Sequence, residues 1–224
     1  MAAKKFYAVK KGKVPGLYTD WEACKASVDG FPKAEYKGFI TLEEAKTYLG
    51  ESALVPSYVT VPGRLLTYVD GSYDDSLPKY AFGCVFLLEG GEIRLAYGNG
   101  DNPQSLKHRN VTGEMLGAMY AVKTAMMNGF QSVEICYDYE GIEKWVTGSW
   151  RSKTELTQKY AASMRDWGKS IEILFTKVAA HSNIVYNELA DRTAKRGLTE
   201  GNGIPKVMKL EELERYEGGE NAFK

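Results

Sequence analysis

Residues 65–72 read LLTYVDGS, an apolar run that ends in an acid and a Gly-Ser pair. Such a run, bounded by turn-forming residues, predicts a buried β-strand over residues 65–70 with Asp70 at its end. A second run of this kind covers residues 133–137 and is followed by Asp138. If the two strands are parallel, their carboxyl ends meet at one edge of a sheet. We therefore expect Asp70 and Asp138 to lie side by side.

The segments around these two strands alternate between strand-like and helix-like patterns. Residues 80–88 and 92–98 are rich in β-forming residues, and Glu89-Gly90-Gly91 joins them as a tight hairpin. Apolar residues then recur at helical spacing from Met115 to Met126, before an Asn-Gly stop. This order predicts an α/β fold, a mixed five-stranded sheet with helices on its faces. The remaining elements are a strand at 171–175 and helices at 140–147, 154–167 and 187–197.

The first fifty residues follow a separate, smaller pattern in the order ββαβα. Short strands are expected at 6–9, near 17–18 and at 36–40, and helices after the capping patterns Thr19/Glu22 and Thr41/Glu44. Gly, Ser and Pro residues then interrupt any period. The chain is therefore divided by prediction into a small domain at 5–50, a linker at 51–64, an α/β domain at 65–198 and a tail at 199–224 with a short helix.

The composition is that of an ordinary globular protein, with 44% hydrophobic and 26% charged residues among 224. No apolar stretch approaches the ~20 residues of a membrane span, and the first residues do not resemble a secretory leader. The three cysteines are scattered, so a disulfide framework is not expected. We therefore expect a cytoplasmic monomer that binds no membrane.

Charge is unevenly distributed, although the net charge is zero. Ten Lys/Arg residues stand against seven Asp/Glu before residue 65, and five lysines precede the first acid. A basic start beside a neutral body suits an anionic partner at the front of the chain. A solvated lysine face explains the same pattern, so charge alone leaves both explanations open.

Four acids, Asp70, Glu114, Asp138 and Asp191, each have an ordinary structural explanation. Asp70 could form a turn and Asp138 could cap a helix. Glu114 could complement the helix macrodipole in a first turn, and Asp191 could pair with Lys195. Their joint placement favours another role, because converging carboxylates hold hard divalent cations and two such cations can cleave a phosphodiester. Without cations, the mutual repulsion of the four charges would be unbalanced.

Four motifs stand out in residues 67–198. They are Thr67-Tyr68-Val69-Asp70-Gly71-Ser72, Asn110 with Glu114, Tyr137-Asp138, and His181 followed by Asn187-Glu188-Leu189-Ala190-Asp191. In this combination they resemble the ribonuclease H domain of cellular type I enzymes. The resemblance implies a ribonuclease H-like fold and cleavage of the RNA strand of an RNA/DNA hybrid, leaving 5′-phosphate and 3′-hydroxyl ends. It also implies two Mg²⁺ ions, replaceable by Mn²⁺, held by Asp70, Glu114, Asp138 and Asp191.

The resemblance assigns further roles around the metal site. Asn110 would contact the minor groove and the 2′-OH, the group that distinguishes RNA from DNA, with Gly71 and Ser72 beside it. His181 would be a catalytic residue that assists proton transfer or product release, and Glu188 would support the metal ligands. Asn183 stands where the family often has glycine, which affects the loop around His181 rather than the acids. His108 matches no motif and is expected at the surface.

The front domain resembles the hybrid-binding domain of eukaryotic and some bacterial ribonucleases H, which also occurs in a caulimovirus protein. Trp21, Tyr36 and Lys37 match its binding residues, since a ring can pack on deoxyribose while a lysine meets phosphate. Gly38 replaces a common second lysine. Alternatively, Trp21 and Tyr36 are core aromatics of a small domain. The matching stretch includes FYAVKKG at 6–12, Trp21, Phe31-Pro32 and YKGF at 36–39.

Two other functions stay open on the sequence, a non-catalytic duplex-binding protein on a nuclease scaffold and a transposase-like nuclease acting on DNA. The intact acids argue against the first, and Asn110 with the front domain argues against the second. The segment from Trp145 to Thr154 is short, with only Arg151 and Lys153 basic. We therefore expect the front domain to supply grip on the hybrid that the larger domain lacks.

Overall fold

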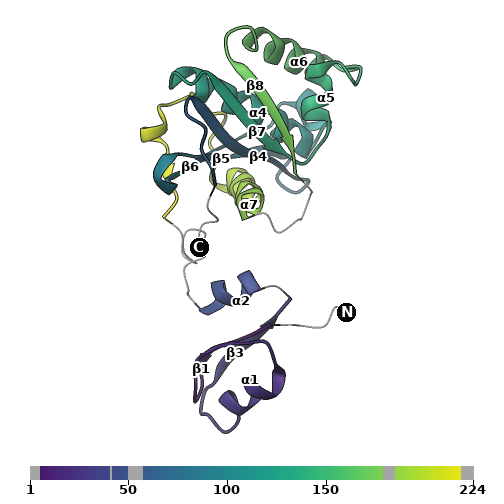
Figure 1. Ribbon diagram of the computed structural model, residues 1–224. Helices are drawn as coiled ribbons and strands as arrows, with labels where there is room; N and C mark the ends of the chain where they lie inside the picture. The colour runs from purple at the N-terminus through teal and green to yellow at the C-terminus, as the bar shows by residue number, and fades with distance from the viewer. Residues whose placement is uncertain (1–5, 41, 50–57, 179–184, 218–224) are drawn as a thin grey trace. The chain divides into compact units, whose positions relative to one another are not determined.

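The computed structural model describes residues 6–40, 42–49, 58–178 and 185–217. The chain forms two compact units, one within residues 1–57 and one from Tyr58 to Tyr216. Figure 1 shows that each combines strands and helices. In the part of the chain that is described, no helix is long and apolar enough to cross a lipid bilayer.

The first unit is a three-stranded antiparallel sheet with two helices, in the predicted ββαβα order. Strand β1 (Phe6–Lys11) lies between β2 (Gly16–Tyr18) and β3 (Glu35–Phe39). Helix α1 (Trp21–Val28) precedes β3, and helix α2 (Leu42–Leu49) follows it. The small buried core of this unit therefore forms between β1 and α1, and contains Val9, Cys24 and Val28.

Helix α1 begins one residue later than its capping pattern predicts. The side chain of Asp20 accepts a hydrogen bond from the Ala23 N–H at 2.9 Å and caps the helix. The predicted Thr19 cap is wrong, because an aspartate is an equally good cap and stands nearer the first helical residue.

The second unit contains a six-stranded mixed sheet in the order β8-β7-β4-β5-β6-β9. Strands β4, β5 and β6 form an antiparallel meander, whereas β7 and β8 are parallel to β4. The predicted mixed α/β sheet is confirmed, with one strand more than the five expected. The strands are β4 (Arg64–Asp74), β5 (Lys79–Leu87), β6 (Ile93–Gly100), β7 (Ser132–Tyr137), β8 (Glu172–Lys177) and β9 (Glu214–Arg215).

Helices occupy the positions that the apolar spacing predicts. The main core lies between the sheet and the helices that follow β6 and β7, and Leu65, Val69, Phe82 and Met115 are buried in it. The helices are α3 (Pro103–Leu106), α4 (Asn110–Met127), α5 (Gly141–Thr147), α6 (Glu155–Trp167) and α7 (Val185–Glu200), with 3₁₀ turns η1 (Glu89–Gly91) and η2 (Leu210–Glu212).

The sixth strand comes from the tail, where a short helix is predicted. The tail instead forms the single turn η2 and then β9, which pairs with β6 at the edge of the sheet. Arg196 on α7 donates to both carboxylate oxygens of Glu214 at 2.7 Å, and its guanidinium lies 4.5 Å from the ring centroid of Tyr97. These distant partners specify β9, and a two-residue strand leaves no pattern in the sequence.

Strand β4 is longer than its apolar run predicts. It continues through Gly71 and Ser72 to Asp74 and stays paired with β5 along this length. A turn at Gly71-Ser72 is therefore excluded, and Asp70 lies within the strand rather than at its end. The parallel pairing with β7 stops at Tyr68. Asp70 thus lies just beyond the parallel ladder, beside the end of β7.

Helices α4 and α7 cover opposite faces of the sheet, and glycines bring each into backbone contact with it (Figure 1). A Cβ atom on Gly71 would lie 2.1 Å from the Asn110 carbonyl of α4. Gly83 pairs with Asp70 and therefore faces the other side, where a Cβ would lie 2.4 Å from the Ala190 carbonyl of α7. Only residues without a side chain fit both positions.

We expect Gly113→Ala to destabilise the protein, because its Cβ would lie 1.9 Å from the Ala81 carbonyl of β5. Overpacking of this kind typically costs ~1–3 kcal/mol. Gly117→Ala on the same helix is the control, since its Cβ would meet Val69 at 3.3 Å and alanine favours a helix over glycine by ~1 kcal/mol. Urea unfolding measures the difference, and equal stability of the two variants would contradict the close approach of α4.

Candidate functional site

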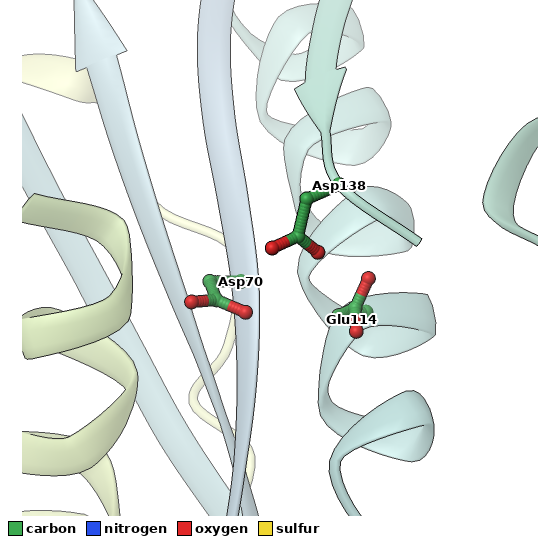
Figure 2. A group of neighbouring side chains, drawn as sticks. All are labelled: Asp70, Glu114 and Asp138. Carbon is green, nitrogen blue, oxygen red and sulfur yellow. The ribbon is translucent and has the colours of Figure 1, made fainter. Parts of the chain in front are cut away.

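Three carboxylates from three different elements converge at one edge of the sheet. Asp70 lies on β4, Asp138 follows β7 and Glu114 lies on α4. One oxygen of each lies within 4.8 Å of the others, and Figure 2 shows the three groups pointing toward one another. Helix α5 is capped at Glu140, so Asp138 does not cap it. We call Asp70, Glu114 and Asp138 the acidic triad.

Burial and mutual repulsion raise the pKa of two triad members. The pKa of Asp70 rises to about 7, first because of burial and then because of Asp138 and Asp191. The pKa of Glu114 rises to about 9, first through burial and then through Asp138 and Asp70. The Gly71 N–H donates to Asp70 at 2.7 Å and offsets part of the first shift. Carboxylates held this close favour a bound cation or a proton.

Glu114 is the most confined member of the triad. It is 1% exposed, and its Oε2 has no hydrogen-bond partner among the residues that the structure describes. It lies past the first turn of α4, so the alternative role at the positive end of the helix macrodipole does not hold. An unpartnered buried carboxylate oxygen costs free energy, and a divalent cation with oxygen ligands would satisfy it. The triad therefore fits a metal ion.

Asp191 lies near the triad but outside it. Its side chain on α7 is 37% exposed, and its Oδ2 accepts a hydrogen bond from Lys195 at 2.7 Å. This is the ion pair that the sequence offers as the structural explanation of Asp191. Asp191 nevertheless raises the pKa of Asp70 while Lys195 lowers it, so both lie close to the same edge. The structure brings three of the four predicted acids together and turns the fourth toward Lys195.

The other residues predicted for this site lie along β4 and at helix starts. Gly71 and Ser72 continue β4 beyond Asp70. Asn110 is the exposed first residue of α4, and Glu188 is exposed in the first turn of α7. His181 lies outside the described residues, so its place in the site stays a prediction.

The aromatic residues predicted in the first unit lie on its surface. Trp21 is 39% exposed and Tyr36 is 44% exposed, with ring centroids 6.1 Å apart. Tyr7 packs against the Trp21 ring at 5.3 Å. The alternative that Trp21 and Tyr36 form the core of the unit is therefore wrong, because both rings lie on its surface. Lys37 is also exposed but lies on the opposite face of β3, with its ammonium group 5.5 Å from the Phe39 ring centroid.

A cavity of about 450 Å³, with Tyr139 in its wall, is absent from the predictions. Its wall is formed by the α5–α6 connection and the turn before α4. These segments are far apart in the sequence and meet only in the folded chain. The sequence contains one sign of this cavity, because two tryptophans and two basic residues lie within the nine positions 145–153. His108 is half-buried in its wall, which corrects its expected place on the surface. We call this the aromatic-basic cavity, and its walls include His108, Tyr139, Trp145, Trp150, Arg151 and Lys153.

Two protein families match the chain, one for each unit. Residues 62–199 match the family described as RNase H, and residues 5–49 match the family described as Ribonuclease H1 N-terminal domain. The first match spans more than half of the 224 residues. The chain belongs to the ribonuclease H family. The predicted ribonuclease H-like fold and front domain are thereby confirmed.

Named relatives agree with a ribonuclease H. Ribonuclease H1 of Rattus norvegicus is 25% identical over 260 residues, which cover 88% of this chain and 90% of the relative. Ribonuclease H of Saccharomyces cerevisiae is 45% identical over 53 residues, 24% of this chain and 15% of the relative. The N-terminal RNase H domain of a Mycobacterium tuberculosis protein, solved as a fusion with maltose binding protein, has the same fold. Its TM-score is 0.50 at 15% identity, over 60% of this chain and 93% of that one.

This ribonuclease H is therefore an enzyme with the activity of its family. Ribonucleases H depend on divalent metal ions, and the acidic triad could hold one. The donor set consists of carboxylate oxygens, which suit hard cations.

We expect the metal-free ribonuclease H to lose stability as the pH rises. Asp70 and Glu114 bind protons more tightly in the folded chain than in the unfolded chain, because their pKa values are raised from 3.8 to about 7 and from 4.5 to about 9. Ionising them in the folded state costs free energy, so the free energy of unfolding falls between about pH 4 and pH 9. Thermal unfolding in EDTA across this range measures the slope.

Asp70→Asn should raise the Tm in EDTA at pH 8 by a few degrees, at ~2–4 °C per kcal/mol. Asp74→Asn on the same strand is the control, because Asp74 is only partly buried and its pKa is lowered by hydrogen bonds from Ser76. It should not raise the Tm. A Tm of Asp70→Asn no higher than that of the wild type at pH 8 would contradict the repulsion within the triad.

Proposed function

We propose that this ribonuclease H is an endoribonuclease that hydrolyses the RNA strand of RNA/DNA hybrids at a two-metal site, leaving 5′-phosphate and 3′-hydroxyl ends. The observation that carries the proposal is the acidic triad, in which the buried Oε2 of Glu114 has no hydrogen-bond partner among the described residues. Asp191 would complete the ligand set after leaving Lys195. Three carboxylates are thus already in place, and the fourth side chain has to move.

Mg²⁺ is the proposed ion, and Mn²⁺ should substitute, because all four side chains offer hard oxygen ligands. When bound, two such ions would lower the pKa of a water molecule and stabilise the leaving 3′-oxygen. The fold positions three of these ligands. Strand β4 and the end of β7 position Asp70 and Asp138, and α4 positions Glu114, which is buried. His181 would exchange protons near the cut.

RNA recognition would begin at the start of α4. The Asn110 carbonyl packs over Gly71, so Asn110 lies beside the strand that carries Asp70. From this position its amide can bond to a 2′-OH, which DNA lacks. The aromatic-basic cavity, lined by Tyr139 directly after Asp138 in the chain, offers rings for sugars and basic groups for phosphates. It would give the duplex a second contact besides Asn110.

The first unit would supply a second grip on the hybrid. Its match to the Ribonuclease H1 N-terminal domain, its exposed rings of Trp21 and Tyr36, and the exposed Lys37 on the other face of β3 support this role. The sequence places the hybrid-binding domain at 5–50, the linker at 51–64 and the catalytic domain at 65–198, and the compact unit that carries the acids runs from Tyr58 to Tyr216. We also infer a cytoplasmic monomer, on the sequence alone.

Asp70→Asn and Glu114→Gln should each lower kcat/KM for a labelled hybrid by roughly 10²–10⁴, because each removes a ligand charge but keeps the side-chain shape. Asp74→Asn at the end of β4 is the control and should retain activity. The wild-type products should carry a 5′-phosphate that a phosphatase removes and a 3′-hydroxyl that a polymerase extends. Undiminished Mg²⁺-dependent cleavage by Asp70→Asn would refute the metal site.

Trp21→Ala should weaken binding of the full-length protein to an RNA/DNA hybrid about tenfold, since stacking on an aromatic ring is worth ~1–3 kcal/mol. It should also shorten processive runs, while kcat at saturating hybrid stays unchanged. Val14→Ala, which removes another apolar side chain of the same unit that is 62% exposed, is the control. If Trp21→Ala leaves affinity and processivity unchanged, Trp21 does not bind the hybrid.

A further inference from the structure

Arg109 adopts a backbone conformation that glycine alone adopts without strain. Its φ is 50° and its ψ is −130°, at the residue that precedes the first turn of α4. Its side chain makes no capping hydrogen bond to the helix. Strain of this kind persists only where surrounding contacts enforce it. Contacts around Arg109 must therefore compensate for this strain.

Two contacts from the β4–β5 hairpin hold this side chain. The Arg109 guanidinium lies over the Tyr73 ring, 5.5 Å from its centroid, and pairs with Asp75 at 3.7 Å. Tyr73 lies two residues after Gly71 on β4, so both face α4. The strained residue thus links the start of α4 to the strand that carries Asp70.

The peptide that follows Arg109 begins α4 and places Asn110. The Thr112 hydroxyl donates to the Ser105 carbonyl of α3 at 2.6 Å, which ties the first turn back to the preceding helix. On the other side, the Asn110 carbonyl fills the space that a Cβ on Gly71 would need. The start of α4 is therefore fixed by α3, by β4 and, through Arg109, by the hairpin.

We propose that Arg109 is a positioning residue for ribose recognition, which sets where Asn110 meets the 2′-OH of the RNA strand. The inference rests on the proposed role of Asn110 in the hybrid. Arg109 acts through the start of α4 and not through a contact of its own with the substrate. Its side chain is 65% exposed, so a direct contact with a phosphate is the competing explanation.

A double-mutant cycle on Arg109 and Asn110 separates the two explanations. Arg109→Gly removes the guanidinium with its two contacts and frees the backbone at this residue, so the start of α4 is no longer held in one conformation. Asn110→Ala removes the amide. With the full-length protein, Mg²⁺ and a labelled hybrid, each single change should lower kcat/KM about tenfold, the size of one lost hydrogen bond. The double variant should lose no more than Asn110→Ala alone, because both changes break the same contact. Lys107→Ala removes an exposed charge from the same corner and should leave kcat/KM unchanged.

A second readout uses hybrids whose RNA strand carries one 2′-deoxynucleotide, placed in turn at each position around the cut. The wild type should lose rate at the position that Asn110 contacts, whereas Arg109→Gly should become insensitive there. Urea unfolding should show Arg109→Gly at least as stable as the wild type. If Arg109→Gly does not fold, Tyr73→Leu removes the ring under the guanidinium and should show the same loss of 2′-OH sensitivity.

Additive losses, with 2′-OH sensitivity retained in Arg109→Gly, would overturn the positioning role. If the slope of log affinity against log salt concentration is also smaller by about one in Arg109→Gly, Arg109 contacts a phosphate of the substrate backbone. A different result tests the underlying assignment: if Asn110→Ala alone changes neither cleavage nor 2′-OH sensitivity, the role of Asn110 fails and the role of Arg109 fails with it.

Discussion

The backbone contact between α4 and the β4–β5 pair is the constraint on which the site depends. At Gly71 and Gly113 the helix comes closer to the strands than any side chain would allow. This approach carries Glu114 to the edge where Asp70 and Asp138 lie. Because main-chain packing places the residues that carry them, the three carboxylates are brought together by the fold itself. The Gly71 N–H and Lys195 offset part of the electrostatic cost at Asp70, and a proton or a cation would offset more of it.

The fourth carboxylate differs from the other three in its freedom. Asp191 is partly exposed on a helix surface, and its partner Lys195 is a neighbour on the same helix. An exposed ion pair of this type is weak, typically ~0.2–1 kcal/mol, so a divalent ion competes with it easily. The proposed metal centre thus combines three fixed ligands with one adjustable ligand, as suits ions that enter with the substrate and leave with the product.

Local patterns predict the parts of this structure that local forces determine. Two apolar runs followed by acids are enough to place Asp70 and Asp138 together, since parallel strands share one edge. The length of β4 escapes prediction, because Gly71-Ser72 has turn-forming residues and only pairing with β5 extends it. The left-handed φ of Arg109 is equally invisible, since an arginine gives no sign of a conformation that favours glycine.

The candidate site shows the same division. The sequence motifs identify the acids of the site. Which way Asp191 turns, and the place of His108 in the wall of the aromatic-basic cavity, depend on the folded structure. For the first unit, the exposure of Trp21 and Tyr36 decides between a binding surface and a core, and spacing along the chain does not contain that information.

Because β9 pairs with β6, the sheet of the second unit includes a strand that follows α7 in the chain. At Arg94 and Leu95, pairing with β9 occupies an edge of β6 that would otherwise offer unpaired N–H and C=O groups to solvent. Such groups are a template for strands of other chains. A chain cut after the last residue of α7 would keep its acids but leave this part of the edge open. The tail therefore covers a stretch of backbone that could otherwise pair with a foreign strand.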